Sequence, residues 1–128
     1  MKTLRLILGD QLSFNLPTLR DIDPVKDIVR MAEVMTEVTH VKHHKRKIAF
    51  LFSAMRHFAK SLEDDGLKIS YRQLDDPENT GSLAGEVTAA INVFDPDRIV
   101  VTAPGEYRLA EDMAGWQKLF NLPVIILP

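Results

Sequence analysis

The 128-residue sequence predicts an α/β fold in which a parallel sheet is covered by helices on both faces. Two observations lead to this prediction. Five short runs rich in Ile, Val and Leu have the length of buried strands, and segments with helical spacing separate the later runs. Such alternation requires right-handed crossovers between parallel strands. We therefore expect residues 1–128 to form one Rossmann-like, three-layer α/β/α domain, with a five-stranded parallel sheet of order 3-2-1-4-5.

The predicted strands are bounded by polar residues, glycine or proline, which commonly end strands. In chain order they are Leu4–Leu8, Ile28–Met31, Ile69–Tyr71, Ile99–Thr102 and Val124–Leu127. The connection between the first two, residues 9–26, contains Pro17 and Pro24 and has weak periodicity. It is expected to be irregular, with at most a short helix.

Three segments have the apolar spacing of helices that pack against a sheet. The first carries a stripe over residues 48–62 and should end near Gly66, because glycine suits the left-handed residue that closes a helix. The second runs from about Ser82 to Phe94 and ends before Pro96. The third is expected to run unbroken over residues 106–120.

The composition is that of a globular domain, with 45% hydrophobic and 27% charged residues. The absence of cysteine excludes disulfides, thiolate metal sites and iron–sulfur clusters within these residues. No run approaches the roughly 20 apolar residues of a membrane span, so no membrane contact and a cytoplasmic location are expected. A net charge of −2 provides no general attraction for nucleic acid.

Ligands of open parallel sheets bind beyond the carboxyl ends of the strands, where the strand order reverses. This rule singles out the polar loops 9–13, 33–37 and 102–108. Gly9 permits a tight turn or a close approach to a ligand, and Asp10 and Gln11 offer a carboxylate and an amide. Neither the dinucleotide-binding glycine pattern nor the P-loop pattern is present. A simple turn and a ligand-binding loop both remain open here.

A basic run at residues 40–47 leads directly into the first long helix. Cations are disfavoured in the first turn of a helix, so acidic neighbours such as Glu33 and Glu37, or an anionic ligand, should compensate them. A metal site on Glu33, Glu37, His40 and His44 is a further alternative if this segment is helical. It is weak, because nearby lysines and arginine oppose a cation. We predict no metal ligand and no catalytic residue.

Several strings resemble the N-terminal domain of the photolyase-related proteins of bacteria, the iron–sulfur bacterial cryptochromes and (6-4) photolyases. The most specific are residues 6–13 (LILGDQLS), 33–37 (EVMTE) and 43–59 (HHKRKIAFLFSAMRHFA). The later strings are Asp75-Asp76, Gly81-Ser82, Gly85-Glu86-Val87 and Pro104-Gly105-Glu106. The resemblance extends over essentially all 128 residues.

The resemblance implies an antenna domain that holds 6,7-dimethyl-8-ribityllumazine. In that family a C-terminal helical domain follows, which carries FAD and a 4Fe–4S cluster bound by four cysteines. The antenna absorbs blue light and passes excitation energy to the flavin, which donates an electron to a UV lesion in DNA. On this basis the chain lacks the helical domain, is non-catalytic alone, and contacts DNA only as part of the full-length protein.

The resemblance also implies a chromophore pocket built from the same loops. Its expected residues are Gly9, Asp10, Gln11, Leu12, Glu37, His43, His44, Lys47, Gly105 and Glu106. Two other interpretations stay open. One is a stand-alone module for a nucleotide or another anionic small molecule. The other is a docking domain with an apolar patch around Phe50 and His57.

Overall fold

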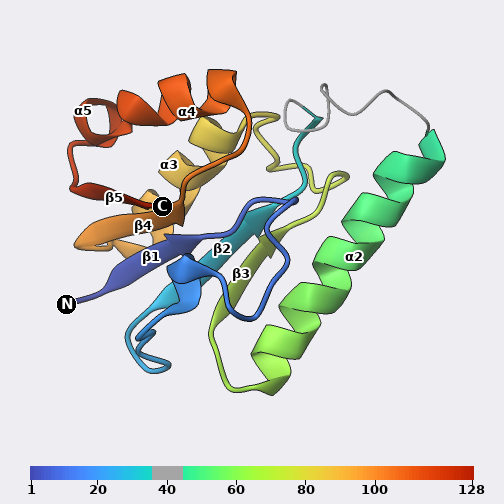
Figure 1. Cartoon of the computed structure of the whole chain (residues 1–128), viewed down its shortest axis with the longest axis horizontal. Coiled ribbons are helices and arrows are strands. Elements are labelled where there is room, and N and C mark those ends of the chain that lie inside the picture. Colours follow the sequence, from blue (N-terminus) through green and yellow to red (C-terminus); the bar gives the residue numbers. More distant parts are fainter. Residues whose placement is uncertain (36–44) are drawn as a thin grey trace.

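The computed structural model describes residues 1–35 and 45–128 of the chain (Figure 1). Its sheet is all parallel, with the order β3-β2-β1-β4-β5. The strands are β1 (Thr3–Leu6), β2 (Ile28–Ala32), β3 (Ile69–Arg72), β4 (Arg98–Thr102) and β5 (Val124–Leu127). The predicted five-stranded parallel sheet and its strand order are confirmed.

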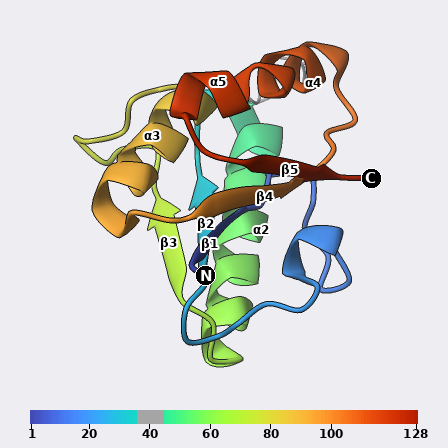
Figure 2. The same cartoon turned by 90° about the vertical axis from the view of Figure 1, so that its left-hand side faces the viewer.

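Helices cover both faces of this sheet, so the predicted three layers are confirmed (Figures 1 and 2). They are the long helix α2 (Lys45–Asp64) on one face, and α3 (Leu83–Phe94), α4 (Tyr107–Ala114) and α5 (Trp116–Phe120) on the other. Within the described ranges, no helix is both long and apolar enough to cross a membrane.

Alternation along β1 and the residues after it divides the core into two clusters. Leu4, Leu6 and Leu8 pack with residues of α3 and α5, while Ile7 packs with Phe52 of α2 and its neighbours. This is the pattern of a strand that is buried on both faces, because successive side chains point to opposite sides. The apolar run Leu4–Leu8 could therefore be predicted to form a strand before its neighbouring strands were known.

The connection between β1 and β2 is irregular, as predicted, and contains one short 3₁₀ helix, η1 (Pro17–Leu19). It is held by the buried Arg5, whose Nε donates to Asp27 Oδ2 at 2.9 Å. The Arg5 Nη1 also donates to the carbonyl oxygens of Thr18 at 2.8 Å and Arg20 at 2.9 Å. A guanidinium inside the domain thus replaces the regular hydrogen bonding that this segment lacks.

The predicted unbroken helix over residues 106–120 is wrong, because the segment forms two helices that meet at Gly115. The Gly115 N–H donates to Asp112 O at 3.1 Å, three residues back, which is the pairing of a 3₁₀ turn and not of an α-helix. Glycine weakens a helix interior by about 1 kcal/mol relative to alanine. Trp116, just after the break, is buried in the core, and the centroid of its ring lies 5.4 Å from that of Phe120.

Candidate functional site

The candidate site lies at the carboxyl edge of the sheet, where the strand order reverses between β1 and β4. Gln11 joins the loops that follow these two strands. Its Nε2 donates to Thr102 O at 2.9 Å, and its Oε1 accepts from Leu8 N–H at 3.2 Å. The structure therefore brings together the loops that the sequence predicted to share a site. Both the oxygen and the nitrogen of the Gln11 amide therefore take part in holding the two loops together.

Gly9 lies against α2, where an added side chain would make a tight contact. A Cβ atom on Gly9 would stand 3.1 Å from Met55 Sδ and 3.8 Å from Leu51 Cδ1. A small apolar cavity of about 10 Å³ lies between Gly9, the ends of β1 and β2, and Phe52. Such a volume holds one water molecule at most. A larger ligand does not fit in this cavity.

Among the described residues, two that the sequence placed in the pocket lie exposed on the outer side of the edge. Asp10 and Gly105 are exposed, and a Cβ atom added to Gly105 would meet no atom within 4 Å. Glu106 begins α4, because its Oε2 accepts from Leu109 N–H at 2.8 Å. Leu12 packs with the cluster beneath α2. Of these predicted pocket residues, Asp10 thus presents an exposed carboxylate at the surface, while the Glu106 carboxylate caps a helix.

Four of the residues named from the sequence, Glu37, His40, His43 and His44, lie outside the described residues. Lys47, in the first turns of α2, is exposed. Among the residues that the structure does describe, no three His, Asp or Glu side chains are grouped so that they could hold a metal ion.

Glu33, named above as a possible partner of the basic run or metal ligand, has a different role. Its carboxylate is buried and accepts from Arg56 at 2.6 and 2.8 Å, from Tyr71 Oη at 2.5 Å and from Leu74 N–H at 2.9 Å. Burial by itself would raise the pKa of Glu33, but these donors outweigh burial and lower it. Glu33 therefore fastens α2 to β3 beside the candidate site.

Glu86 of α3 is a second buried carboxylate, which the sequence analysis did not single out. It accepts from Arg30 at 2.9 Å, from Arg72 at 2.6 Å, and from the N–H and Oγ1 of Thr80 at 2.8 and 2.6 Å. Burial opposes ionisation here too, and the hydrogen bonds from Thr80 and Arg72 keep the pKa of Glu86 lowered. The sequence did contain a sign of this buried carboxylate, because Glu86 lies on the same apolar face of the helix as Leu83, Val87 and Ala90.

Gly85 supports this arrangement, because the turn before α3 passes close to it. An added Cβ atom would overlap Thr80 Oγ1 and stand 2.9 Å from Ser82 Oγ. Thr80 cannot move away freely, since its Oγ1 donates to Glu86 at 2.6 Å. The string Gly85-Glu86 thus serves packing and a buried ion pair.

Replacement of Gly85 by alanine is expected to lower the free energy of unfolding by about 1–3 kcal/mol, the usual cost of an overpacked site. Gly105→Ala is the matched control, because the added methyl group enters open space. It should stay within about 0.5 kcal/mol of the wild type. Urea unfolding measures both values. A Gly85→Ala protein as stable as the control would contradict the close packing described here.

Two comparisons with known proteins give the same result. A model of the family described as "Deoxyribodipyrimidine photo-lyase-related protein" matches residues 5–128. A protein of Agrobacterium fabrum (strain C58 / ATCC 33970) named "(6-4) photolyase" is 48% identical over 126 residues, which cover 98% of this chain and 25% of that protein. The chain thus spans about a quarter of the length of the curated relative that it matches.

Proposed function

The chain belongs to the deoxyribodipyrimidine photo-lyase-related protein family, and from this premise we propose that it is the antenna domain of a photolyase- or cryptochrome-related flavoprotein. In this proposal the domain binds a light-harvesting chromophore and passes its excitation energy to FAD held elsewhere in the protein. The main support is the match along the whole α/β domain to a (6-4) photolyase about four times as long. The resemblance inferred from the sequence strings is confirmed at the level of the family.

The proposed chromophore is 6,7-dimethyl-8-ribityllumazine, which would contact the outer side of the carboxyl edge. The cavity of about 10 Å³ beneath Gly9, bounded by described residues, is too small for a ring system. The exposed Asp10 carboxylate suits the N–H and hydroxyl donors of a ribityl-substituted ring, and the open space at Gly105 leaves room for it. Glu37, His43, His44 and Lys47 would complete the site from the segment that leads into α2. When bound, the chromophore absorbs blue light.

Such a role requires the chain to hold a chromophore in a fixed position. It requires no catalytic residue. The network around Glu33 and the bridge made by Gln11 support rigid loops at this edge. We assign FAD, the 4Fe–4S cluster and the contacts with DNA to a C-terminal helical domain of the full-length protein. The four cysteines that such a cluster needs have no counterpart in these 128 residues.

Titration of the purified chain with 6,7-dimethyl-8-ribityllumazine, followed by the fluorescence of the chromophore, tests the proposal. We expect saturable binding, and an affinity for Glu37→Ala lower by roughly 5- to 150-fold, because a polar ligand edge that loses its hydrogen-bond partner costs about 1–3 kcal/mol. Glu63→Ala removes an exposed carboxylate near the far end of α2 and should bind as the wild type does.

Parallel titrations with ATP and FMN separate the antenna role from a phosphate-binding module. Binding of ATP without binding of the lumazine would overturn the proposal and support the nucleotide-binding alternative. Unchanged lumazine affinity in Glu37→Ala would remove Glu37 from the site while leaving the antenna role in place.

A further inference from the structure

We propose that Gln11 is a positioning residue for the chromophore. Its side-chain amide fixes the place of Asp10 in the site, and it donates no hydrogen bond to the ligand itself. This role rests on the proposed function, because it concerns the same site. It differs from the role expected from the sequence, in which Gln11 was one of the residues that line the pocket.

Gln11 closes a tight turn that presents Asp10. The Gln11 N–H donates to Leu8 O at 3.0 Å, as in a β-turn, and the Leu8 N–H donates back to Gln11 Oε1 at 3.2 Å. Gly9 and Asp10 are the two central residues of this turn. Two hydrogen bonds between the ends of the turn therefore fix the backbone of its central residues.

The other end of the amide ties this turn to the end of β4. Gln11 Nε2 donates to Thr102 O at 2.9 Å and to Ala103 O at 3.4 Å. The amide can take only this orientation, because the Leu8 N–H needs an acceptor and the two carbonyl oxygens need a donor. Nε2 has two hydrogens and two carbonyl acceptors, which leaves no unpaired N–H for a ligand.

Thr102 is itself held in place from within the domain. Its Oγ1 accepts from the Thr18 N–H at 3.1 Å and lies 2.6 Å from Thr18 Oγ1. Thr18 belongs to η1 and is completely buried, and its carbonyl oxygen accepts from Arg5 Nη1 at 2.8 Å. Gln11 therefore ties the turn to a fixed point of the sheet.

Asp10 is the group that this arrangement presents. It is exposed, and its carboxylate makes no hydrogen bond to any residue that the structure describes. A carboxylate accepts from N–H and hydroxyl groups, which a ribityl-substituted ring supplies. An acceptor that is already fixed before binding does not have to be ordered by the ligand. Gln11 thus contributes to affinity through the position of Asp10.

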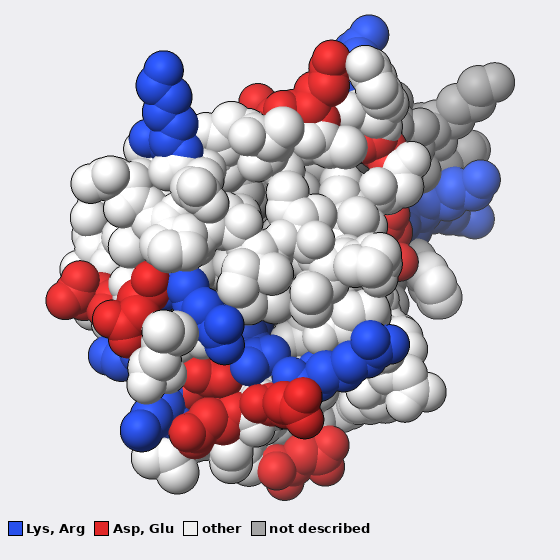
Figure 3. Space-filling view, turned by 60° about the vertical axis from the view of Figure 1, so that its left-hand side comes forward, with Lys and Arg blue, Asp and Glu red and all other residues white. Residues whose placement is uncertain are grey.

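The segments beside the amide contain no charge that could compensate a carboxylate in its place. Residues 99–105 and 119–128, which include most of β4 and all of β5, contain no Asp, Glu, Lys or Arg. Figure 3, in which the side of the molecule with β5 comes forward, shows a broad area without charged side chains. Gln11→Glu keeps an acceptor for the turn but sets a carboxylate oxygen against two carbonyl oxygens. It should therefore lose the tie to β4.

Titration of the purified chain with 6,7-dimethyl-8-ribityllumazine tests this role. Gln11→Met keeps the length of the side chain and removes the hydrogen bonds of the amide. We expect its affinity to fall roughly 3- to 10-fold, because the ligand must then order a turn that the wild type holds in place. Gln11→Glu should lose at least as much.

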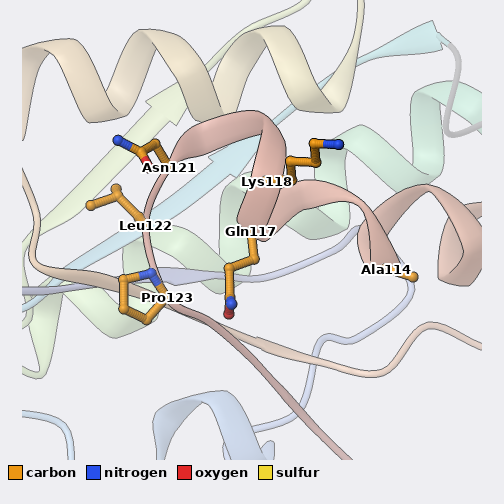
Figure 4. Close-up of a pocket in the computed structure, with 6 residues that line it drawn as sticks. All are labelled: Ala114, Gln117, Lys118, Asn121, Leu122 and Pro123. Carbon is orange, nitrogen blue, oxygen red and sulfur yellow. The ribbon is translucent and has the colours of Figure 1, made fainter.

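Gln117→Met is the matched control, because it makes the same substitution at a glutamine that also binds the backbone. Gln117 Oε1 accepts from the Val124 N–H at 3.3 Å, at the start of β5 and thus at the opposite edge of the sheet. Figure 4 shows Gln117 extending from α5 into a hollow that Pro123 also lines. Its replacement should leave the affinity for the lumazine unchanged.

Hydrogen exchange of the ligand-free chain separates positioning from direct contact. The Leu8 N–H should exchange at least about tenfold faster in Gln11→Met, because it loses its acceptor. Asp10→Asn should lower the affinity without changing this exchange. Because Gln11 acts through Asp10, the loss of affinity in the double variant should be smaller than the product of the two single losses.

The fluorescence anisotropy of the bound chromophore provides a spectroscopic signature. At saturation, the lumazine should keep less of its anisotropy in Gln11→Met than in the wild type, because one side of its site is no longer fixed. A residue that only stabilises the fold would leave this anisotropy unchanged in a folded variant.

Three results would overturn this role of Gln11 while leaving the antenna role in place. They are unchanged lumazine affinity in Gln11→Met, an equal loss in Gln117→Met, and a loss without faster exchange of the Leu8 N–H, which would make Gln11 a direct contact. A wild type that binds no lumazine would instead overturn the proposed function, and this role with it. Circular dichroism of each variant verifies that the fold is intact.

Discussion

Replacement of Glu86 by alanine is expected to lower the free energy of unfolding by about 3–5 kcal/mol, the usual result of removing one partner of a buried ion pair. The guanidinium of Arg30, 5% exposed, would lose its carboxylate partner. The Thr80 N–H and Oγ1 would lose their acceptor as well. A domain of this size has a total stability of roughly 5–15 kcal/mol, so the loss takes a large share of it.

Urea unfolding followed by the fluorescence of the single, buried Trp116 measures this loss. Glu78→Ala is the matched control. Glu78 Oε2 lies 3.4 Å from Nη1 of Arg72, which also binds Glu86, but the Glu78 side chain is 82% exposed. Its removal should cost less than about 1 kcal/mol. Replacing both partners, with Arg30→Met and Glu86→Leu, should recover part of the loss, since the buried Arg30 charge is then not left unpaired. Equal effects of Glu86→Ala and Glu78→Ala would contradict the buried pair.

The stability of the domain is expected to fall as the pH drops below about 4.5, the ordinary pKa of a glutamate. Burial would raise the pKa of Glu33 and Glu86, but their donors lower both values in the folded state. The unfolded chain then binds protons at a higher pH than the folded chain does. The stabilisation is present above pH 4.5 and is lost as the pH falls through the folded pKa.

Urea unfolding at a series of pH values between about 7 and 3 measures this dependence through its slope. Glu33→Gln should lower stability at pH 7 and give a shallower decline in acid, because one of the two carboxylates is gone. Glu63→Gln, at an exposed position of α2, serves as the control and should follow the wild-type curve. An unchanged slope in Glu33→Gln would show that Glu33 does not contribute to acid unfolding.

The family strings include residues whose importance is structural. Gly9 gives room to Met55, Gln11 joins two loops, and Gly85 passes close to Thr80. Each of these was readable in the sequence as part of a pattern, but the pattern did not reveal these packing contacts. That distinction depends on which atoms approach the residue from distant parts of the chain.

The strands and helices could be predicted from the sequence because that information is local, and the strand order followed as the usual order of a Rossmann-like fold. A run such as residues 99–102 is apolar on both faces, and the helices between the later strands allow one handedness of connection. The end of α2 at Asp64, just before Gly66 with φ of +93°, was predictable for the same reason. The break at Gly115 was missed, because the apolar spacing continues across it and glycine alone does not require a break.

The contacts of single side chains at the candidate site were decided by the tertiary structure. Glu33 is followed by a basic run in the sequence, yet its carboxylate binds Arg56 of α2, Tyr71 of β3 and the backbone of Leu74 just after β3. Local sequence determines which segments form strands and helices, because backbone geometry and apolar periodicity act over a few residues. Long-range contacts decide what a buried carboxylate binds, because its partners lie far away along the chain.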